Sequence, residues 1–152
     1  MYAEFLKEFL PLLKKKGFRA YLETNGTMPG ELKQVIGLVD IVAMDLKLPS
    51  STKGAAYWKE HTGFLKIACA KEVFVKAVVT ADTEEGDIRR AVALVKSVDA
   101  GIPLIIQPAT KVRRSDKAVG KERLDHFFEM VSAGGIKDAC VIPQMHKILG
   151  IR

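Results

Sequence analysis

Hydrophobic residues along the chain follow two alternating spacings. In some segments they recur every three or four positions, which is typical of a helix with one buried face. In others, short runs rich in valine and isoleucine lie between turn residues, which favours strands. The spacing predicts helices over residues 2–16, 29–38, 83–98 and 119–133, a helical or partly irregular connection over 53–70, and strands over 19–24, 40–46, 72–80, 102–107 and 139–142.

The first expected helix contains a proline near its middle. Apolar residues recur at helical spacing from Phe5 to Leu13, and Gly17 is a typical stop signal. Because Pro11 lacks a backbone N–H, we expect it to kink this helix or to split it in two.

Strands and helices alternate along the chain, with roughly 20–35 residues between successive strands. This order favours parallel strands joined by helical crossovers over an antiparallel sheet, in a single domain spanning residues 1–152. In folds of this kind, ligands bind beyond the carboxyl ends of the strands. Four strand ends are therefore expected at one rim, at residues 24–26, 45–47, 80–82 and 107–110.

The composition is that of an ordinary globular protein. Of 152 residues, 48% are hydrophobic and 28% charged, which excludes disordered, collagen-like and low-complexity chains. Lys and Arg number 24 against 18 Asp and Glu, so the formal charge is 24 − 18 = +6. This charge permits an anionic ligand or nucleic acid without requiring either, and no nucleic-acid partner is expected.

Cysteine content and the N-terminal segment predict a cytoplasmic protein. Cys69 and Cys140 are isolated in sequence, which fits neither a secreted disulfide framework nor a paired zinc motif. The N-terminal segment has acids within its apolar stretch and lysines after it, the reverse of a secretory signal. No stretch reaches the roughly 18 apolar residues of a membrane span, so no membrane association is expected.

Asp45 and Lys47 end an otherwise apolar strand and allow two interpretations. Charged groups are costly to bury unpaired, so the two side chains could form an ion pair that caps the sheet. Alternatively, Asp45 could accept hydrogen bonds from sugar hydroxyls while Lys47 binds a ligand carboxylate. The sequence leaves both open.

Three further positions near strand ends allow alternatives. The dipeptide Asn25-Gly26 is either an ordinary turn or a place where a ligand approaches the backbone closely. Gln107 either recognises a base edge or satisfies a loop carbonyl. Lys76 shares a strand face with Phe74 and Val78, and so either points inward near the site or extends outward past a helix.

The histidines and one basic stretch are less specific signals. His61, His126 and His146 have no spacing that would form a metal site, and structural roles are expected for all three. The stretch 111–123 carries six Lys or Arg residues and follows a strand end. It is either a solvated loop or a lid over an anionic substrate.

Taken together, the strand ends resemble those of radical S-adenosylmethionine (SAM) enzymes, specifically the 7-carboxy-7-deazaguanine synthase family. The resemblance implies a partial (β/α) barrel of parallel strands with outer helices, corresponding to the C-terminal portion of a radical SAM half-barrel. It covers nearly the whole chain. The matching segments are LETNGT at 22–27, VDIVAMDLKLPSS at 39–51, FVKAVVT at 74–80, QPAT at 107–110 and VIPQMHKILGIR at 141–152.

The resemblance also implies roles for individual residues. Thr24 matches a contact to the pterin substrate, with Lys76 and His146 as further candidate substrate contacts. Gln144 and Lys147 are weaker candidates in the same C-terminal tail. Many relatives have Ser-Pro-Lys where this chain has Asp-Leu-Lys. The positions that match SAM-binding residues are Gly26, Asp45, Leu46, Lys47, Gln107, Pro108, Ala109 and Thr110.

One part of the family pattern is absent from residues 1–152. Family members have a C-x3-C-x2-C loop that holds a [4Fe-4S] cluster, followed by a GGEP strand end, and neither occurs here. The chain therefore resembles the C-terminal two thirds of such an enzyme. Because SAM cleavage needs an electron from the cluster, we expect the chain to be inactive alone. Ligands for the cluster and for Mg²⁺ would lie outside this sequence.

For the complete enzyme, the resemblance implies conversion of 6-carboxy-5,6,7,8-tetrahydropterin to 7-carboxy-7-deazaguanine in queuosine biosynthesis. Two alternatives are an activating enzyme for a glycyl-radical protein, which shares similar strand ends, and a non-catalytic binding module on the same half-barrel. If two earlier strands are missing, the strand over 19–24 presents an unpaired edge. A homodimer formed through that edge is therefore expected.

Overall fold

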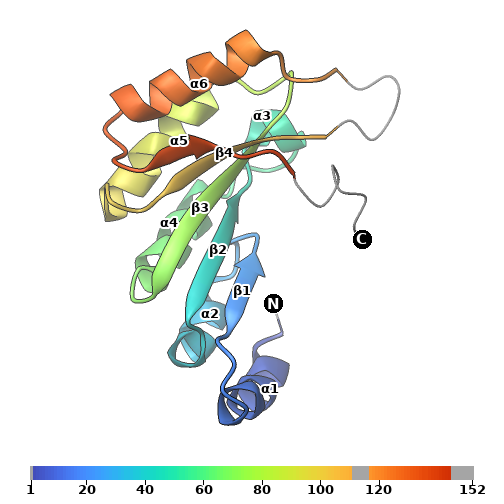
Figure 1. The fold of residues 1–152 in the computed structure, drawn as a ribbon, viewed down its shortest axis with the longest axis vertical. Helices are drawn as coiled ribbons and strands as arrows, with labels where there is room; N and C mark the ends of the chain where they lie inside the picture. Colours follow the sequence, from blue (N-terminus) through green and yellow to red (C-terminus); the bar gives the residue numbers. More distant parts are fainter. Residues whose placement is uncertain (1, 111–116, 145–152) are drawn as a thin grey trace.

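The computed structural model describes residues 2–110 and 117–144. Within them, five parallel strands form one sheet in the order β1-β2-β3-β4-β5 (Figure 1). Each strand therefore pairs with its neighbour in sequence, as in a barrel wall, and the predicted parallel arrangement is confirmed. The strands are β1 (Tyr21–Thr24), β2 (Ile41–Leu46), β3 (Glu72–Val79), β4 (Leu104–Pro108) and β5 (Ala139–Val141).

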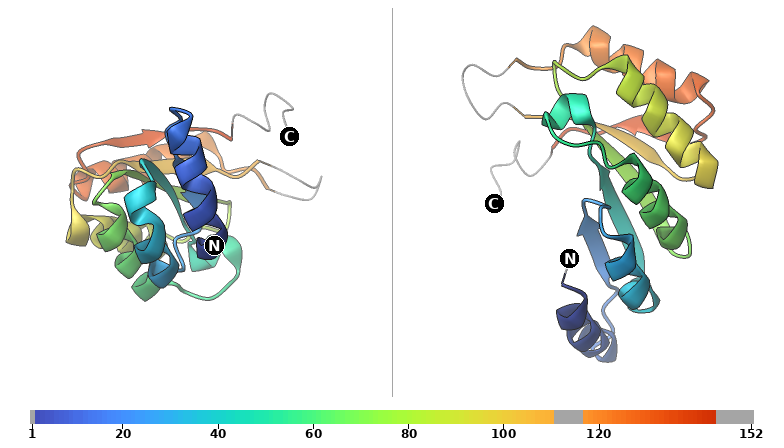
Figure 2. Two further views of the ribbon diagram at one scale, coloured as in Figure 1. Left: turned by 90° about the horizontal axis from the view of Figure 1, so that it is seen from below. Right: turned by 180° about the vertical axis from the view of Figure 1, so that it is seen from behind.

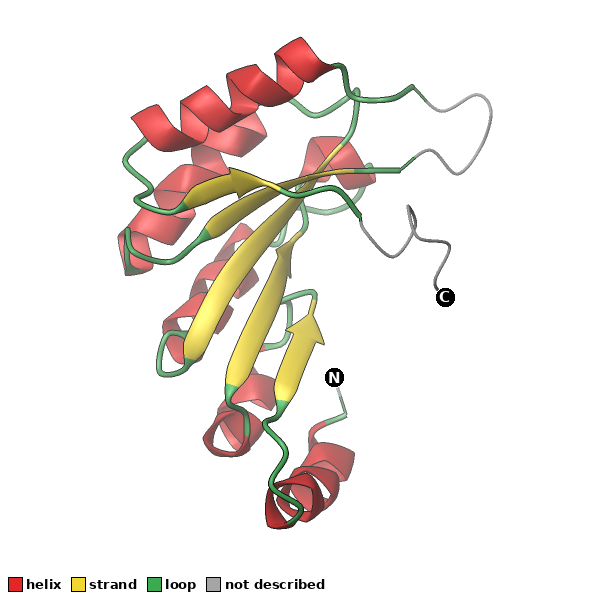
Figure 3. Cartoon of the chain, viewed as in Figure 1, coloured by secondary structure: helices red, strands yellow, loops and turns green. Residues whose placement is uncertain are grey.

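Helices cover one face of this sheet and leave the other face open (Figures 2 and 3). Successive helices also pack against one another, from α1 on α2 through to α5 on α6. The partial barrel with outer helices expected from the sequence is thus the observed architecture. The helices are α1 (Ala3–Lys15), α2 (Pro29–Val35) with the short η1 (Ile36–Leu38), α3 (Pro49–Thr52), α4 (Trp58–Ala68), α5 (Glu85–Val98) and α6 (Lys121–Ala133).

The two faces of the sheet differ because alternate strand residues point in opposite directions. Most helix-face residues of the three central strands are at most 2% exposed and form the core with the helices. Residues on the opposite face, here called the inner face, are mostly half-buried and include charged groups. These buried helix-face residues are Val42, Met44, Leu46, Val75, Ala77, Val79, Leu104 and Ile106.

Two local expectations need correction. Helix α1 continues through Pro11 from Ala3 to Lys15, so the proline does not split it. The short helix α3, Pro-Ser-Ser-Thr, lies where no element was predicted from the sequence. Proline at its first position has the backbone angle a helix needs there. The 53–70 connection is partly irregular, as expected, with α4 beginning only at Trp58.

In the described part of the chain, none of the helices combines the length and the apolar character needed to cross a membrane.

Candidate binding site at the carboxyl ends of the strands

A cavity of about 290 Å³ lies where the carboxyl ends of β1 to β4 meet on the inner face. Side chains from four strands reach it, together with residues of α3 and the segment that follows β5. The expected convergence of separated strand ends on a common hollow is therefore observed at residues 45, 80 and 107. The lining residues are Glu23, Asp45, Leu46, Lys47, Leu48, Ser51, Thr52, Lys76, Val78, Thr80, Gln107 and Gln144.

Four charged side chains form a continuous chain along the cavity wall. Lys76 lies between two carboxylates, with its Nζ paired to Glu23 of β1 and 3.1 Å from Asp45 Oδ1 of β2. The other oxygen of Asp45 is 3.3 Å from Lys47 Nζ. Asp45 Oδ1 is buried and has no well-formed hydrogen bond in the structure, although it lies within ion-pair distance of Lys76. Charges therefore alternate in sign from Glu23 to Lys47.

Register explains why Lys76 points into the cavity. Asp45 and Lys76 are direct partners across the parallel β2–β3 pair, so their side chains lie on the same face. Burial alone would lower the pKa of Lys76, but its contacts with the Glu23 and Asp45 carboxylates outweigh this effect, and the pKa is raised above its ordinary value. Lys76 is therefore a cation at neutral pH. Of the two orientations considered from the sequence, the inward one is correct.

Hydrogen bonds between α3 and the start of α5 fix one wall of the cavity. Thr83 is fully buried, and its Oγ1 accepts a hydrogen bond from Thr80 N at 2.7 Å and lies 2.7 Å from Ser51 Oγ. Ser50 donates both its N–H and its hydroxyl to Asp87 Oδ2, at 2.8 and 2.6 Å. Ser51 and Thr80 line the cavity, so these bonds define its shape.

The segment after β5 joins the wall through Gln144. Its Oε1 accepts a hydrogen bond from Thr110 N at 3.1 Å, which ties this segment to the end of β4. Gln107 and Gln144 both line the cavity and bring amide groups next to the charged chain. The site therefore offers carboxylates, ammonium groups, amides and hydroxyls to a polar ligand.

Several candidates from the sequence do not line the cavity. Thr24 is the register partner of Met44, on the helix face, and Gly26 is buried in the following turn. Pro108, Ala109 and Thr110 are also not among the lining residues, although Thr110 binds Gln144. His146 and Lys147 lie outside the described residues, as do residues 111–116 of the basic stretch.

Conversely, several lining residues were not among the site candidates. Glu23 lies one position before Thr24 and faces the cavity because side chains alternate along β1. Glu23 pairs in register with Ala43, two residues before Asp45, so its side chain lies on the same face of the sheet as Asp45 and Lys76. This register, had it been known, would have identified Glu23 as a lining residue. The others are Leu48, Ser51 and Thr52, which belong to or adjoin the unexpected α3, and Val78 of β3. Thr80 was expected at the rim as a strand end, although no role was assigned to it.

Two of the histidines lie away from this cavity. His61 is fully buried in α4, where its Nε2 is 3.1 Å from the Asn25 carbonyl oxygen. His126 on α6 pairs with Glu85 of α5 at 3.0 Å. Both form contacts between elements, as expected for structural residues. Among the described residues, no group of three His, Cys, Asp or Glu side chains is arranged to hold a metal ion.

Comparison with solved structures identifies the fold. A domain of pyruvate-formate lyase-activating enzyme from Bacteroides vulgatus matches with a TM-score of 0.74 at 12% identity, covering 93% of this chain and 91% of that one. A radical SAM methyltransferase from Sphaerobacter thermophilus matches with a TM-score of 0.62 at 14% identity, covering 84% of this chain and 42% of that one. The architecture is thus a partial barrel with the same fold as these two proteins.

Comparison of sequences is more specific. The 7-carboxy-7-deazaguanine synthase of Geobacter sulfurreducens is 35% identical over 97% of this chain, which covers 58% of that protein. Those of Methanopyrus kandleri and Thermococcus kodakarensis are each 30% identical over 95% and 96% of the chain, which covers 53% and 57% of them. No family model matches the chain. By sequence, the chain is a relative of the 7-carboxy-7-deazaguanine synthases.

The chain spans between about half and two thirds of the length of these curated relatives, from 53% to 66%. The expectation that it corresponds to part of a longer enzyme agrees with this coverage. The resemblance inferred from the strand-end motifs is confirmed, and the sequence relatives do not favour the glycyl-radical activating enzyme, whose likeness rests on fold at 12% identity.

Proposed function

We propose that the cavity binds SAM and part of the pterin substrate of a 7-carboxy-7-deazaguanine synthase. One observation carries this proposal: Asp45 and Lys47 at the end of β2 and Gln107 at the end of β4, which resemble cofactor-binding positions of that family, line one cavity although the two strand ends are about 60 residues apart in sequence. Their convergence does not follow from the sequence similarity alone. The three residues together offer a carboxylate, an ammonium group and an amide to a single ligand.

The side chains suit the chemistry of SAM. The ammonium of Lys47 is about one third exposed and can bind the carboxylate of the methionine part. Asp45 and Glu23 offer carboxylate oxygens that accept hydrogen bonds from ribose hydroxyls or an ammonium group. The amide of Gln107 can both donate to and accept from an adenine edge. Lys76 and Gln144 line the same cavity, next to these groups.

The residues of this chain do not fit a [4Fe-4S] cluster. Such a cluster needs three cysteine thiolates from one site in this family, and the chain has only two cysteines. Cys69 follows α4 and Cys140 lies in β5, on separate elements. In the part of the chain that the structure describes, no three His, Cys, Asp or Glu side chains are grouped so as to hold a metal ion. The role proposed for this chain is therefore ligand binding, and no step of the radical reaction is assigned to its residues.

In the complete enzyme, the proposed reaction converts 6-carboxy-5,6,7,8-tetrahydropterin to 7-carboxy-7-deazaguanine with loss of ammonia. SAM would supply the radical chemistry in that enzyme, and Asp45, Lys47 and Gln107 are the residues of this chain that would hold it. The contribution of this chain is to orient the cofactor and the pterin along the inner face. A small-molecule substrate is consistent with the polar character and size of the cavity.

Isothermal titration calorimetry with S-adenosylhomocysteine tests the binding proposal, because this analogue keeps the adenosine and the amino-acid part of SAM. We expect saturable binding by the wild-type chain and a loss of about tenfold in affinity for Lys47→Met. The matched control Lys59→Met changes a lysine on α4, outside the lining residues, and should bind like wild type. Absence of binding by the wild-type chain would refute the proposal.

A second titration addresses the substrate. Adding 6-carboxy-5,6,7,8-tetrahydropterin to the chain saturated with S-adenosylhomocysteine should give a further binding heat. No heat would remove the pterin assignment while leaving the cofactor site intact, and would favour a protein substrate of the kind an activating enzyme uses.

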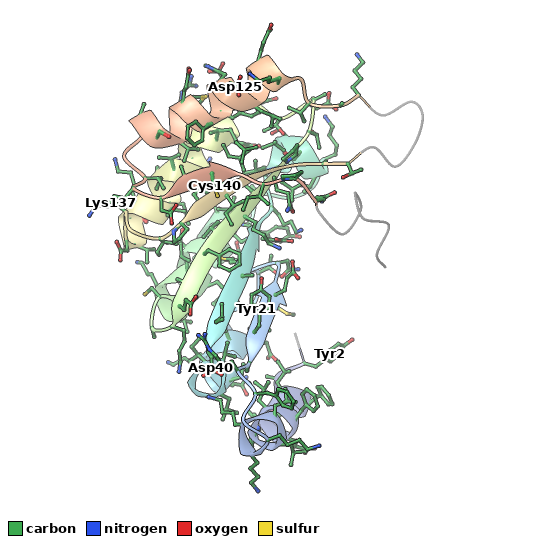
Figure 4. All side chains as sticks on the ribbon, viewed as in Figure 1. Tyr2, Tyr21, Asp40, Asp125, Lys137 and Cys140 are labelled. Carbon is green, nitrogen blue, oxygen red and sulfur yellow. The ribbon has the colours of Figure 1, made fainter. Side chains whose placement is uncertain are left out.

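We also propose that the protein forms a homodimer through β1 and α1. Within the described residues β1 pairs on one side only, with β2. The adjoining α1 exposes Phe5 and Leu12, and Tyr2 projects from its start, as Figure 4 shows. Burying these side chains and the strand edge would stabilise a dimer. Light scattering at high protein concentration should therefore give twice the monomer mass, and a monomer mass would exclude this dimer.

A further inference from the structure

Lys76 is the most enclosed charge in the cavity. Its side chain is 13% exposed, compared with 35% for Lys47 and 60% for Glu23. It is the cation that contacts carboxylates from two different strands, Glu23 of β1 and Asp45 of β2. An ammonium has three donors, and two of those of Lys76 are directed at these carboxylates. Lys76 therefore has at most one donor left for a direct contact to substrate, the role that the family resemblance had suggested for it.

The charges of the cavity balance only with Lys76 present. Glu23 and Asp45 contribute −2, and Lys47 and Lys76 contribute +2, so the four side chains sum to zero. Without Lys76, the sum would be −1, and Asp45 would be left with one cation. A partly buried carboxylate that loses one partner binds the remaining one more strongly, because leaving it unpaired is costly. The remaining partner is Lys47.

Lys47 is the group that the proposed function assigns to the ligand carboxylate. In the structure its Nζ is 3.3 Å from Asp45 Oδ2, longer than the 3.1 Å between Lys76 Nζ and Oδ1. Asp45 thus forms ion pairs with both lysines, and the more buried Lys76 is the nearer of the two. This sharing leaves Lys47 able to exchange its contact with Asp45 for a contact with an incoming anion.

We propose that Lys76 is a positioning and specificity-determining residue: it neutralises Glu23 and Asp45, so that Lys47 stays available to the carboxylate of a zwitterionic ligand. This inference rests on the proposed function of the cavity and assigns a role to a residue that need not contact the ligand. It predicts that Lys76 controls affinity only for ligands that carry the carboxylate.

Two ligands separate this role from a general structural one. S-adenosylhomocysteine carries the amino-acid carboxylate, whereas 5′-methylthioadenosine keeps the adenosine and sulfur but lacks the amino-acid part. For Lys76→Met, calorimetry should show about tenfold weaker binding of S-adenosylhomocysteine and unchanged binding of 5′-methylthioadenosine. Lys76→Arg keeps the cation and should restore most of the lost affinity. Equal weakening of both ligands would overturn the inference and indicate general damage to the site.

A double variant tests the charge argument and is less prone to unfold. Asp45→Asn combined with Lys76→Met removes the carboxylate together with its buried cation, so nothing draws Lys47 away from the ligand. Because Asp45 is itself a proposed ligand contact, the measurement for this variant is the reactivity of Lys47 toward a labelling reagent in the absence of ligand. Lys47 should react faster than in Lys76→Met alone, and a rate no higher than in the single variant would contradict the inference.

A measurement without ligand keeps the inference separate from the proposed function. Reductive methylation with labelled formaldehyde, read by mass spectrometry, should modify Lys47 several-fold more slowly in Lys76→Met than in wild type, because Asp45 then holds Lys47 more tightly. Lys59 on α4 should react equally in both proteins. Unchanged Lys47 reactivity would overturn the inference, whereas failure of the wild type to bind either adenosine compound would overturn the proposed function alone.

Discussion

Gly26 packs against Met44 so closely that a β-carbon on residue 26 would lie 2.7 Å from the Met44 Cγ. Its φ of +66° also falls in the left-handed region that favours glycine. Gly26→Ala should therefore destabilise the protein by about 1–3 kcal/mol, through backbone strain and overpacking. Urea denaturation followed by circular dichroism measures this directly.

Gly30→Ala is the matched control for this substitution. Gly30 lies at the start of α2, and no atom lies within 4 Å of the place that an added β-carbon would occupy. Alanine should therefore be neutral there or stabilising by up to about 1 kcal/mol. If both alanine variants were equally stable, the close contact with Met44 would have no energetic consequence.

His61 makes stability depend on pH near neutrality. Burial lowers its pKa below the ordinary value, more than its hydrogen bond to the Asn25 carbonyl raises it, so the ring is neutral in the folded protein at pH 7. The unfolded chain takes up a proton at about pH 6.5, so folding stability is complete above that pH and decreases as the pH falls below it.

The measurement for His61 is the free energy of unfolding at several pH values between 5 and 7.5. Wild type should lose stability across this range as the pH falls. His61→Gln keeps a donor for the Asn25 carbonyl but does not titrate, so its slope should be shallower. Identical slopes for the two proteins would show that His61 is accessible to protons in the folded state.

The fold could be predicted largely from the sequence because its signals are local. Buried parallel strands are continuous apolar runs, and each is bounded by turn residues that limit its length. Two local features depended on tertiary structure instead. Pro11 is accommodated within a helix that packs on α2, and the four-residue α3 is held by Asp87 and Thr83, which are more than 30 residues away in sequence.

The site was predicted less completely, because strand register decides which of two adjacent residues faces the cavity. The strand ends were correctly placed, but Thr24 was chosen where Glu23 is the lining residue. The sequence also left open whether Asn25-Gly26 forms an ordinary turn or a place where a ligand approaches the backbone closely. The close contact of Gly26 with Met44 and its positive φ both favour glycine at this position. Neither point could be decided without knowing how β1 pairs with β2.

Thr83 supports the cavity wall and should be sensitive to loss of its hydroxyl. Thr83→Val preserves shape but leaves Thr80 N without its acceptor and breaks the contact to Ser51. We expect a loss of about 1–3 kcal/mol in stability, together with weaker binding of S-adenosylhomocysteine, because Ser51 and Thr80 line the cavity. Thermal denaturation and calorimetry provide the two measurements.

Thr62→Val is the control for Thr83. The Thr62 hydroxyl donates to the Trp58 carbonyl within α4, at 2.7 Å, and Thr62 is not a lining residue. Its removal should change stability by no more than about 0.5 kcal/mol and leave ligand affinity unchanged. Comparable losses in both variants would mean that the α3–α5 contacts do not support the site.

Asp40, labelled in Figure 4, links the starts of β1 and β2 and gives the protein an acid-sensitive contact. Its Oδ2 accepts a hydrogen bond from Ala20 N at 2.7 Å, and its Oδ1 is 3.0 Å from Lys14 Nζ. The backbone hydrogen bond, followed by the bond from Lys14, lowers the pKa of Asp40. The stability that this contributes is therefore present at neutral pH and is lost as the pH falls below about 4.

Asp40→Asn tests this contribution, since the amide can still accept from Ala20 but carries no charge. The difference in unfolding free energy between wild type and Asp40→Asn should be constant from pH 7 to about 5 and should shrink at lower pH. Lys14→Met should reduce the difference without abolishing it, because the bond from Ala20 is the larger cause. A difference that does not vary with pH would show that the charge of Asp40 makes no contribution to folding.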